Sequence, residues 1–223
     1  MKILITGGGC REYIDSVRVV TNSSTGRTSA VLADELASRK NDVCLITAES
    51  AVKPKNPSVK VILYQTGEEL AQRIREELTS QSYDCVIHAA AVSDFVPDTI
   101  TTGGKTIKAG KNAEKLPSGG EMTVTFRASP KIADRLHEWA KEGGNASAKI
   151  ICFKLLNNAG KVEENQAVGK LFAHSNADFV VYNDLSEITA TVHPFKILSV
   201  KSVCVASGNT NEELAQKILE LVI

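Results

Sequence analysis

The stretch TGGGCREYIDSVRVVTNSSTGRTSAVLADEL, residues 6–36, decides the fold class. A short apolar run from Met1 to Ile5 leads into three consecutive glycines, which is the pattern of a strand followed by a phosphate-binding turn. A convincing amphipathic helix begins only after Asn22, because a long charged segment separates it from the glycines. The glycines therefore indicate either an anion site or simply a tight turn, and the delayed helix leaves a long, charged loop after them.

Beyond this stretch, apolar runs typical of strands alternate with runs of helical period. The strand-like runs cover residues 2–6, 42–48, 59–64, 83–92, 148–156 and 177–184, and the helical runs cover residues 23–40, 67–81, 130–143, 163–175 and 211 onward. Such alternation is typical of a parallel sheet with helices on both faces, whose ligands bind at the carboxyl ends of the strands. Two further runs, 195–200 and 202–207, predict an antiparallel pair at one edge. We therefore predict an α/β fold, a Rossmann-like, doubly wound and mostly parallel sheet with a C-terminal antiparallel extension.

Residues 96–120, VPDTITTGGKTIKAGKNAEKLPSGG, interrupt this alternation and carry no apolar period. A segment of this length and composition predicts a mobile loop. Its lysines belong either to a solvated surface loop or to a lid that brings a lysine onto a polyphosphate. Because no linker and no repeat divides the chain, residues 1–223 are expected to form a single domain.

Composition excludes several classes of protein. The 223 residues include 26 basic and 26 acidic side chains, and this balance argues against a general nucleic-acid or membrane-surface binder. The apolar start is too short for a signal peptide and no stretch could span a membrane, so we expect a soluble, cytoplasmic chain. Cys44, Cys85, Cys152 and Cys204 lie in apolar runs and are expected to be buried, reduced thiols. Cys10 lies in the unusual loop, but no histidine is near it in sequence to activate it.

Dinucleotide-binding patterns fit the glycine turn poorly. Glu12 stands where GxGxxG requires its third glycine, and Arg11 stands at the second glycine of TGxxxGxG. A nicotinamide-dependent reductase, with Glu49 as the ribose partner, is therefore one alternative for this fold. A non-catalytic nucleotide-binding protein is another.

Two other segments bear on ligand binding. The hydroxyls of Asn22–Gly26 either cap the following helix or, with that helix N-terminus, bind phosphate. Arg18, together with Arg11, suggests a ligand with more than one phosphate or two phosphorylated ligands. In the strand-like run that ends near Asp94, small alanines allow a flat group to approach, and the carboxylate could accept from a ribose or a base. His88, in the same run, is interpreted as a core histidine.

The segments REYIDSVRVVTNSSTG, AAAVSDF, EKLPSGGEMTVTFRASPKI, FKL and YNDLS occur in this order, and together they resemble phosphopantothenoylcysteine synthetase, a family of coenzyme A biosynthesis. Residues 10–26 match nearly all of that family's first motif, and the resemblance covers essentially the whole chain. In many bacteria this domain follows a flavin-dependent decarboxylase. The chain resembles the free-standing synthetase without that domain, so the resemblance does not imply flavin binding.

The resemblance implies a phosphopantothenate–cysteine ligase. Such an enzyme activates the carboxylate of 4′-phosphopantothenate with a nucleoside triphosphate and releases pyrophosphate. The amine of cysteine then attacks the acyl-nucleotide. By matching position, Asn22 is similar to the asparagine that holds phosphopantothenate and its acyl intermediate, Lys115 to a lysine that meets the triphosphate, and Arg18 to the motif arginine near that site. The matching positions for nucleotide binding are Gly8, Gly9, Ser24, Thr25, Gly26, Ala90, Ala91, Asp94, Phe153, Asn183 and Asp184.

The resemblance also implies the co-substrates and the partners. CTP or ATP is the expected co-substrate, Mg²⁺ accompanies the triphosphate without a protein cage, and we assign no metal ligand. A homodimer is expected, with the lysine loop and the antiparallel extension near the partner subunit. EKLPS keeps only the first lysine of the bacterial motif EKIKK, and FKLLN lacks the Glu and Thr of FxxET. FKL resembles ATP-using eukaryotic members and YNDLS resembles CTP-using bacterial members, and we favour CTP.

Overall fold

The predicted α/β fold is confirmed by a computed structural model that describes residues 1–116, 119–201 and 203–223. Among these residues, eight strands form the central sheet in the order β13-β12-β11-β10-β6-β1-β4-β5. Their bounds are Lys2–Gly7 (β1), Asp42–Ala48 (β4), Lys60–Tyr64 (β5), Cys85–His88 (β6), Lys149–Leu156 (β10), Phe179–Asp184 (β11), Phe195–Ser199 (β12) and Cys204–Gly208 (β13). The strands from β5 to β11 pair in parallel, whereas β12 and β13 add the antiparallel edge.

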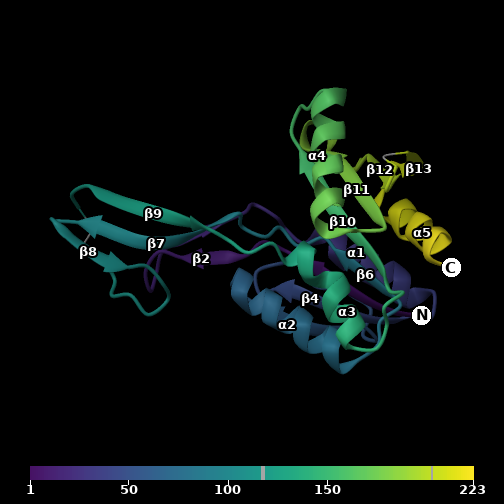
Figure 1. Cartoon of the computed structure of the whole chain (residues 1–223), viewed down its shortest axis with the longest axis horizontal. Helices are drawn as coiled ribbons and strands as arrows, with labels where there is room; N and C mark the ends of the chain where they lie inside the picture. Colours follow the sequence, from purple (N-terminus) through teal and green to yellow (C-terminus); the bar gives the residue numbers. More distant parts are fainter. Residues whose placement is uncertain (117–118, 202) are drawn as a thin grey trace.

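Helices cover both faces of this sheet (Figure 1). On one face lie α1 (Arg27–Ser38) and α5 (Asn211–Val222), and on the other α2 (Gly67–Ser80), α3 (Leu136–Glu142) and α4 (Lys161–Ser175). Short 3₁₀ turns are found at Ile132–Arg135 (η1) and Leu185–Glu187 (η2). The helical period explains the packing: Leu70, Ile74 and Leu78, four residues apart, are all buried on one side of α2. This double layer leaves the carboxyl ends of β1, β4, β6, β10 and β11 at one edge, where the loops of the site begin.

A second, smaller sheet forms an arm that projects from the central sheet (Figure 1). Its strands are β7 (Phe95–Thr102), β8 (Lys105–Lys108) and β9 (Met122–Ala128), paired antiparallel in the order β8-β7-β9. The expectation that residues 96–120 form a loop is therefore wrong for β7 and β8. Gly103 and Gly104 both have positive φ and close a tight hairpin between β-branched runs, a signal that the search for an apolar period missed.

The remaining expectations concern the segment 96–120, the run 202–207 and the cysteines. Residues 117–118 of the segment 96–120 and residue 202 of the strand-like run 202–207 lie outside the described residues. The mobility of 96–120 and the single domain stay predictions. Cys204 is exposed rather than buried, because β13 is the outermost strand of the sheet. Cys44, Cys85 and Cys152 are buried as predicted.

A hairpin inside the opening loop was not predicted. Strands β2 (Arg11–Tyr13) and β3 (Val19–Thr21) pair antiparallel between the glycine turn and α1. Their three-residue lengths are too short to show a period in the sequence. No helix in the described parts of the chain combines the length and the hydropathy needed to cross a membrane.

Candidate functional site

Two glycines with left-handed backbone meet at the carboxyl end of β1. Gly8 has φ 83° and Gly26, the N-cap of α1, has φ 72°. A Cβ on Gly26 would lie 3.4 Å from the Gly8 nitrogen and 2.6 Å from the Ala51 Cβ, so both conformation and space require glycine here. The backbone of the two turns is thereby brought together at a helix N-terminus, which favours an anion.

The cap of α1 differs from the expectation. Ser23, Ser24 and Thr25 were candidates to cap this helix, but the structure gives Gly26 as N-cap with no side-chain cap hydrogen bond. Ser24 and Thr25 are exposed, and the Thr25 hydroxyl accepts only a long 3.4 Å bond from the Arg27 N–H. Their hydroxyls therefore remain accessible to a ligand beside the two glycines.

Asn22 lies against the same turn. Its Nδ2 donates to the backbone oxygens of Ala91 and Val92, at 3.3 Å each. Gly9 forms a parallel bridge with Ala91, and a Cβ on Gly9 would lie 2.6 Å from the Asn22 carbonyl oxygen. The structure thus brings the glycines after β1, Asn22 and the alanines after β6 into one place, although Gly8 and Ala91 are 83 positions apart in sequence.

Asp94 follows these alanines and forms an ion pair with Lys131. The two side chains are 69% and 58% exposed, so solvent weakens the attraction and the carboxylate can exchange this partner for a ligand hydroxyl. Sequence reasoning missed Lys131, because nothing in the sequence relates two positions that lie 37 residues apart.

Lys53 is a second residue that sequence reasoning missed. Its Nζ donates to the carbonyl oxygens of Ala48, Glu49 and Ala51 at 2.7, 2.9 and 2.8 Å, which uses all three of its protons. The Ala51 methyl in turn packs on Gly8 and Gly26. Burial lowers the pKa of Lys53, while Glu49 opposes the shift. Lys53 therefore clamps the loop after β4 that supports the two glycines.

His88 is a buried core histidine, as interpreted from the sequence. Its Nδ1 lies 2.8 Å from the Thr6 hydroxyl, which also accepts a hydrogen bond from the Ala90 N–H at 3.2 Å. The Thr6 proton is therefore free to be donated to a neutral imidazole. Burial lowers the pKa of His88 from its ordinary 6.5 to about 4. His88 holds the start of the alanine turn and is not available to a ligand.

This depressed pKa predicts a loss of stability in acid. Below pH 6.5 the unfolded chain binds a proton at His88, whereas the folded chain binds it only near pH 4. The free energy of unfolding therefore decreases as the pH falls from 6.5 to about 4. We expect His88 to account for a loss of about 3 kcal/mol in the free energy of unfolding between these two pH values. Urea unfolding of wild type and His88→Asn at both pH values measures it. An equal acid loss in the two proteins would contradict the assignment.

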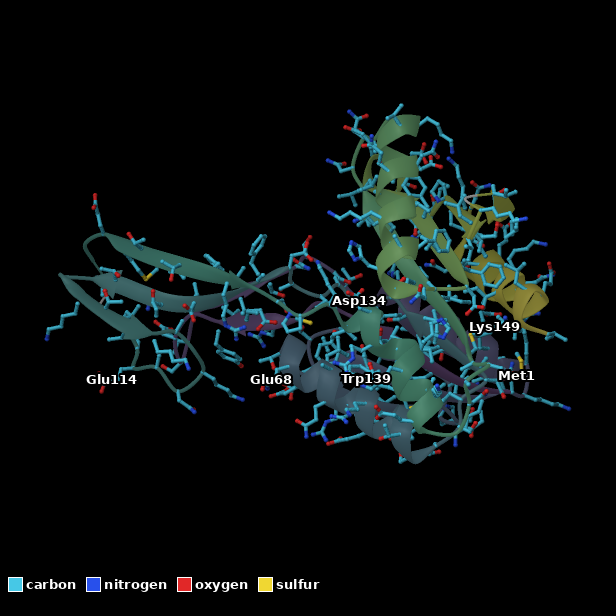
Figure 2. All side chains as sticks on the ribbon, in the orientation of Figure 1. Met1, Glu68, Glu114, Asp134, Trp139 and Lys149 are labelled. Carbon is cyan, nitrogen blue, oxygen red and sulfur yellow. The ribbon has the colours of Figure 1, made fainter. Side chains whose placement is uncertain are left out.

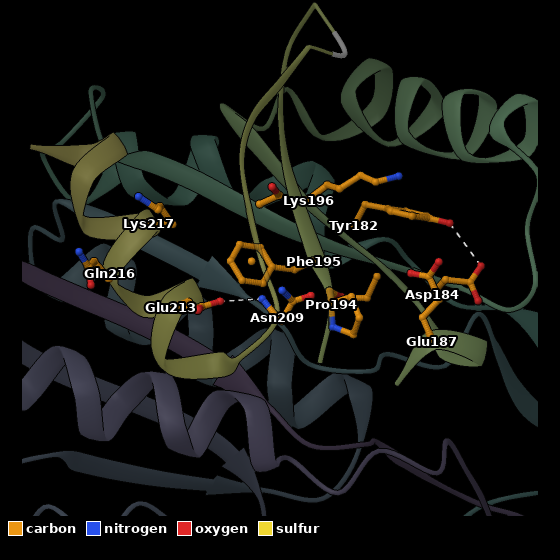
Figure 3. A pocket seen from close by; sticks show the side chains of 13 residues that line it. Tyr182, Asp184, Glu187, Pro194, Phe195, Lys196, Asn209, Glu213, Gln216 and Lys217 are labelled. Carbon is orange, nitrogen blue, oxygen red and sulfur yellow. Dashed lines mark hydrogen bonds between the residues drawn. The ribbon is translucent and has the colours of Figure 1, made fainter. Parts of the chain in front are cut away.

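Phe153, Asn183 and Asp184 lie farther along the same edge of the sheet. Phe153 is half-buried and is one residue beyond the Cys152–His88 pair of β10 and β6. Asn183 and Asp184 end β11 and line a hollow of about 510 Å³ between the antiparallel edge and α5 (Figure 3). The Asn183 Nδ2 donates to the Pro194 carbonyl at 2.7 Å.

Asp184 accepts hydrogen bonds from the loops around it. Its oxygens accept from the N–H groups of Asn158 and Ala159 at 2.8 Å each and from the N–H and hydroxyl of Ser186 at 2.9 and 2.6 Å. The hydroxyl of Ser186 is the main reason that the pKa of Asp184 lies well below its usual range, and the three backbone donors add to it. In this geometry Asp184 fixes the turn between β10 and α4.

Arg18 and Lys115 lie away from this edge, on the side of the arm. Arg18 is in the turn between β2 and β3, and its guanidinium pairs with Asp15. Lys115 is exposed, and in the described parts of the chain its ammonium has no hydrogen-bond partner. Figure 2 shows its neighbour Glu114 beside the projecting arm, well apart from Glu68 at the start of α2. Among the described residues, neither side chain forms a hydrogen bond or an ion pair with Asn22, whose amide contacts Ala91 and Val92 instead.

Cys10 is buried behind the alanine turn, and its N–H donates to the Ala91 carbonyl at 3.3 Å. Burial and, to a smaller extent, the charge of Glu12 raise the pKa of its thiol to about 12. A thiol that stays protonated is a poor nucleophile, so the geometry supports a packing role.

The groups gathered at this edge are of the kind that bind anions. Within residues 1–116, 119–201 and 203–223, no three His, Cys, Asp or Glu side chains are grouped so that they could hold a metal ion. Backbone at a glycine turn, exposed hydroxyls and an oriented amide can bind phosphate and hold a polar acyl group.

Comparison with known proteins identifies the family of the chain. The whole chain, residues 1–223, matches the family model described as DNA/pantothenate metabolism flavoprotein C-terminal domain. A coenzyme A biosynthesis bifunctional protein CoaBC from Thermococcus kodakarensis is 30% identical over 219 residues, which are 97% of this chain and 49% of the relative. The Mycobacterium tuberculosis CoaBC is 35% identical over 160 residues, covering 67% of this chain and 37% of that protein. The chain thus spans about half the length of the full-length CoaBC relatives it matches.

Solved structures share the fold. The DNA/pantothenate metabolism flavoprotein from Streptococcus pneumoniae has a TM-score of 0.85 at 30% identity and covers 100% of this chain and 98% of that chain. A Cab2 mutant in complex with phosphopantothenate-cysteine has a TM-score of 0.73 at 16% identity, with 99% and 86% covered, a likeness of fold alone. The resemblance drawn from the sequence motifs is confirmed at the level of the family: the chain belongs to the family of DNA/pantothenate metabolism flavoprotein C-terminal domains.

Proposed function

We propose that the protein is a phosphopantothenate–cysteine ligase of coenzyme A biosynthesis. It activates the carboxylate of 4′-phosphopantothenate with a nucleoside triphosphate, releases pyrophosphate and passes the acyl group to the amine of cysteine. The observation that carries the proposal is the meeting of Asn22 with two left-handed glycine turns and a helix N-terminus at one edge of the sheet. The CoaBC relatives, whose names place them in coenzyme A biosynthesis, support this pathway.

The proposed roles follow from what each group can donate. Gly8, Gly9 and Gly26 present backbone, and Ser24 and Thr25 present hydroxyls, to phosphate. The amide of Asn22 holds the acyl group in place for attack, since positioning and charge stabilisation are the protein's share of such a reaction. Phe153, on β10, and Asp94, in the connection between β6 and β7, would contact the nucleoside. The anhydride of the acyl-nucleotide supplies the leaving group that a free carboxylate lacks.

The nucleotide is proposed to be CTP, with ATP as the alternative. Mg²⁺ would be held mainly by the triphosphate, which suits an ion that keeps its waters and binds few protein ligands. Exposed carboxylates such as Asp94 could meet its waters. The proposal gives flavin no part in the reaction, since every step is a transfer of an acyl or nucleotidyl group without a redox change.

The test is pyrophosphate release from purified protein with 4′-phosphopantothenate, Mg²⁺ and either CTP or ATP, with and without cysteine. We expect release that depends on phosphopantothenate, stops near one equivalent without cysteine and continues with it. The faster nucleotide identifies the co-substrate. Folded protein that releases no pyrophosphate with either nucleotide would refute the proposal and favour a nucleotide-binding protein or a reductase.

The arm supports the proposed homodimer. Phe95, Ile107, Met122 and Phe126 are 60%, 37%, 42% and 46% exposed, which is unusual for large apolar side chains on a three-stranded sheet. Antiparallel register places Phe126 opposite Pro97 and Met122 opposite Thr102, so β9 turns its apolar residues to one face. A second copy would cover this face and bring the Lys115 segment of one subunit toward the other.

Phe126→Glu is therefore expected to weaken dimerisation at least about tenfold, because it places a charge in an apolar contact. Sedimentation equilibrium of both proteins measures the dissociation constant. Thr123→Glu, on the opposite face of the same strand, is the matched control and should leave it unchanged. A monomeric wild type, or equal weakening by both variants, would remove the arm from the interface.

A further inference from the structure

Asp15 is a fully buried carboxylate in the turn between β2 and β3. It accepts hydrogen bonds from the N–H groups of Val17 at 2.9 Å, Arg18 at 2.7 Å and Leu116 at 3.3 Å, and it pairs with the Arg18 guanidinium. Burial alone would raise the pKa of Asp15, but these donors outweigh it and lower the pKa to about 2. The carboxylate is thus charged at neutral pH and saturated with donors. One of these donors, Leu116, lies at the end of residues 110–116, the lysine segment, about 100 positions from Asp15 in the sequence.

Further bonds tie the lysine segment, residues 110–116, to the same turn. The Gly110 N–H donates to the Ile14 carbonyl at 3.0 Å, and the Ser16 N–H donates to the Ala113 carbonyl at 3.1 Å. The Arg18 guanidinium reaches the Leu116 carbonyl at 3.4 Å. Leu116 is therefore held through both its N–H, by Asp15, and its carbonyl, by Arg18.

Lys115 is held in an exposed position by these hydrogen bonds to its neighbours. It lies between the anchored positions Ala113 and Leu116, and its own side chain is exposed. The turn that anchors it continues directly into β3, which ends one residue before Asn22. The backbone of Lys115 is thus fixed relative to β3, the strand that leads to Asn22 and its proposed acyl-binding amide. An exposed lysine on an unanchored segment would lose that relation.

We infer that Asp15, together with Arg18, is a positioning residue that fixes Lys115 for its contact with the triphosphate. Arg18 then acts through Asp15 and Leu116 rather than on the substrate, which revises the catalytic role expected for it. This inference rests on the proposed function. It predicts that removing the bonds of Asp15 and Arg18 to Leu116, the tie, removes most of the rate that Lys115 adds to acyl-nucleotide formation. Misplacement of a charged group by about 1 Å can cost about 100-fold in rate.

The test combines Asp15→Asn, Lys115→Gln and the double variant. Single-turnover pyrophosphate release without cysteine reports formation of the acyl-nucleotide. We expect each single variant to slow it about 10- to 100-fold and the double variant to be little slower than either. Hydrogen exchange at the Leu116 amide should speed up at least about tenfold in Asp15→Asn. Multiplicative losses in the double variant, or unchanged exchange, would overturn the inference.

Controls separate this role from loss of structure. Asp34→Asn removes a carboxylate that likewise accepts from backbone N–H groups of a loop, at Lys55 and Asn56, far from the arm, and it should leave release unchanged. Arg18→Lys keeps the charge but cannot bridge Asp15 and Leu116 with two nitrogens, so it should shift both measurements in the same direction if Asp15→Asn does not fold. Wild type that releases no pyrophosphate would refute the proposed function and the catalytic role of the tie with it. The exchange data still decide whether the tie exists.

Discussion

Asn22→Asp is expected to lower turnover by about 100-fold or more, in line with the loss of a positioned polar group at a reacting centre. In the variant the Nδ2 that donates to the Ala91 and Val92 carbonyls is replaced by a carboxylate oxygen, which those carbonyl oxygens repel. The side chain would turn away from the β6–β7 connection, and the acyl group would lose its partner. Steady-state turnover with cysteine, compared with pyrophosphate release without it, shows which half of the reaction fails.

The matched control for this substitution is Asn165→Asp. Asn165 is exposed on α4, so the variant makes the same change in charge away from the site. It should keep wild-type turnover, and urea unfolding should show both variants within about 1 kcal/mol of wild type. Unchanged turnover in Asn22→Asp would remove Asn22 from the site, whatever the control does.

Gly8→Ala is expected to destabilise the protein by about 2–5 kcal/mol. A left-handed backbone costs a side chain about 1–2 kcal/mol, and overpacking costs about 1–3 kcal/mol more. The overlap is specific, since a Cβ on Gly8 would lie 2.7 Å from the Ala48 Cβ and 2.9 Å from the Ala51 Cβ. Equilibrium unfolding in urea measures the loss.

Gly144→Ala separates the two contributions to that loss. Gly144 has φ 93°, close to the 83° of Gly8, but a Cβ there would meet no atom within 4 Å. Only the conformational cost remains, so we expect a loss of about 1–2 kcal/mol. Equal losses at the two positions would mean that the loop after β4 yields to the added methyl, and that it supports the glycine turn less firmly than its packing indicates.

Most of the central sheet could be predicted because its signals are local. Buried parallel strands read as apolar runs, and helices such as α2 repeat leucine and isoleucine every four residues, so type and order follow from a short window. The arm could not be predicted in the same way. Its strands are rich in threonine and lysine, because neither face of a projecting sheet packs on the core, and a core-facing period is what the search relied on.

In the candidate site, too, the residues with a local sequence signal could be predicted and the others could not. Gly8 and Asn22 could be named from the opening motif, whose residues are close in sequence and whose chemistry is visible there. Lys53 and Asp15 could not be assigned a role, because each acts on backbone carbonyls or amides, and any sequence supplies those at every position. Arg18 stays a predicted site residue, because a motif gives an arginine its place in the chain but not the direction of its guanidinium, which here pairs with Asp15.

The three carbonyl oxygens around the Lys53 ammonium form a cluster of the kind that coordinates a potassium or sodium ion in other proteins. Here the charge is covalently attached, so the support of the glycine turn does not vary with the salt composition of the medium. A neutral side chain at position 53 would leave the same oxygens facing one another. Their mutual repulsion would then weaken the loop after β4 that supports the glycine turn.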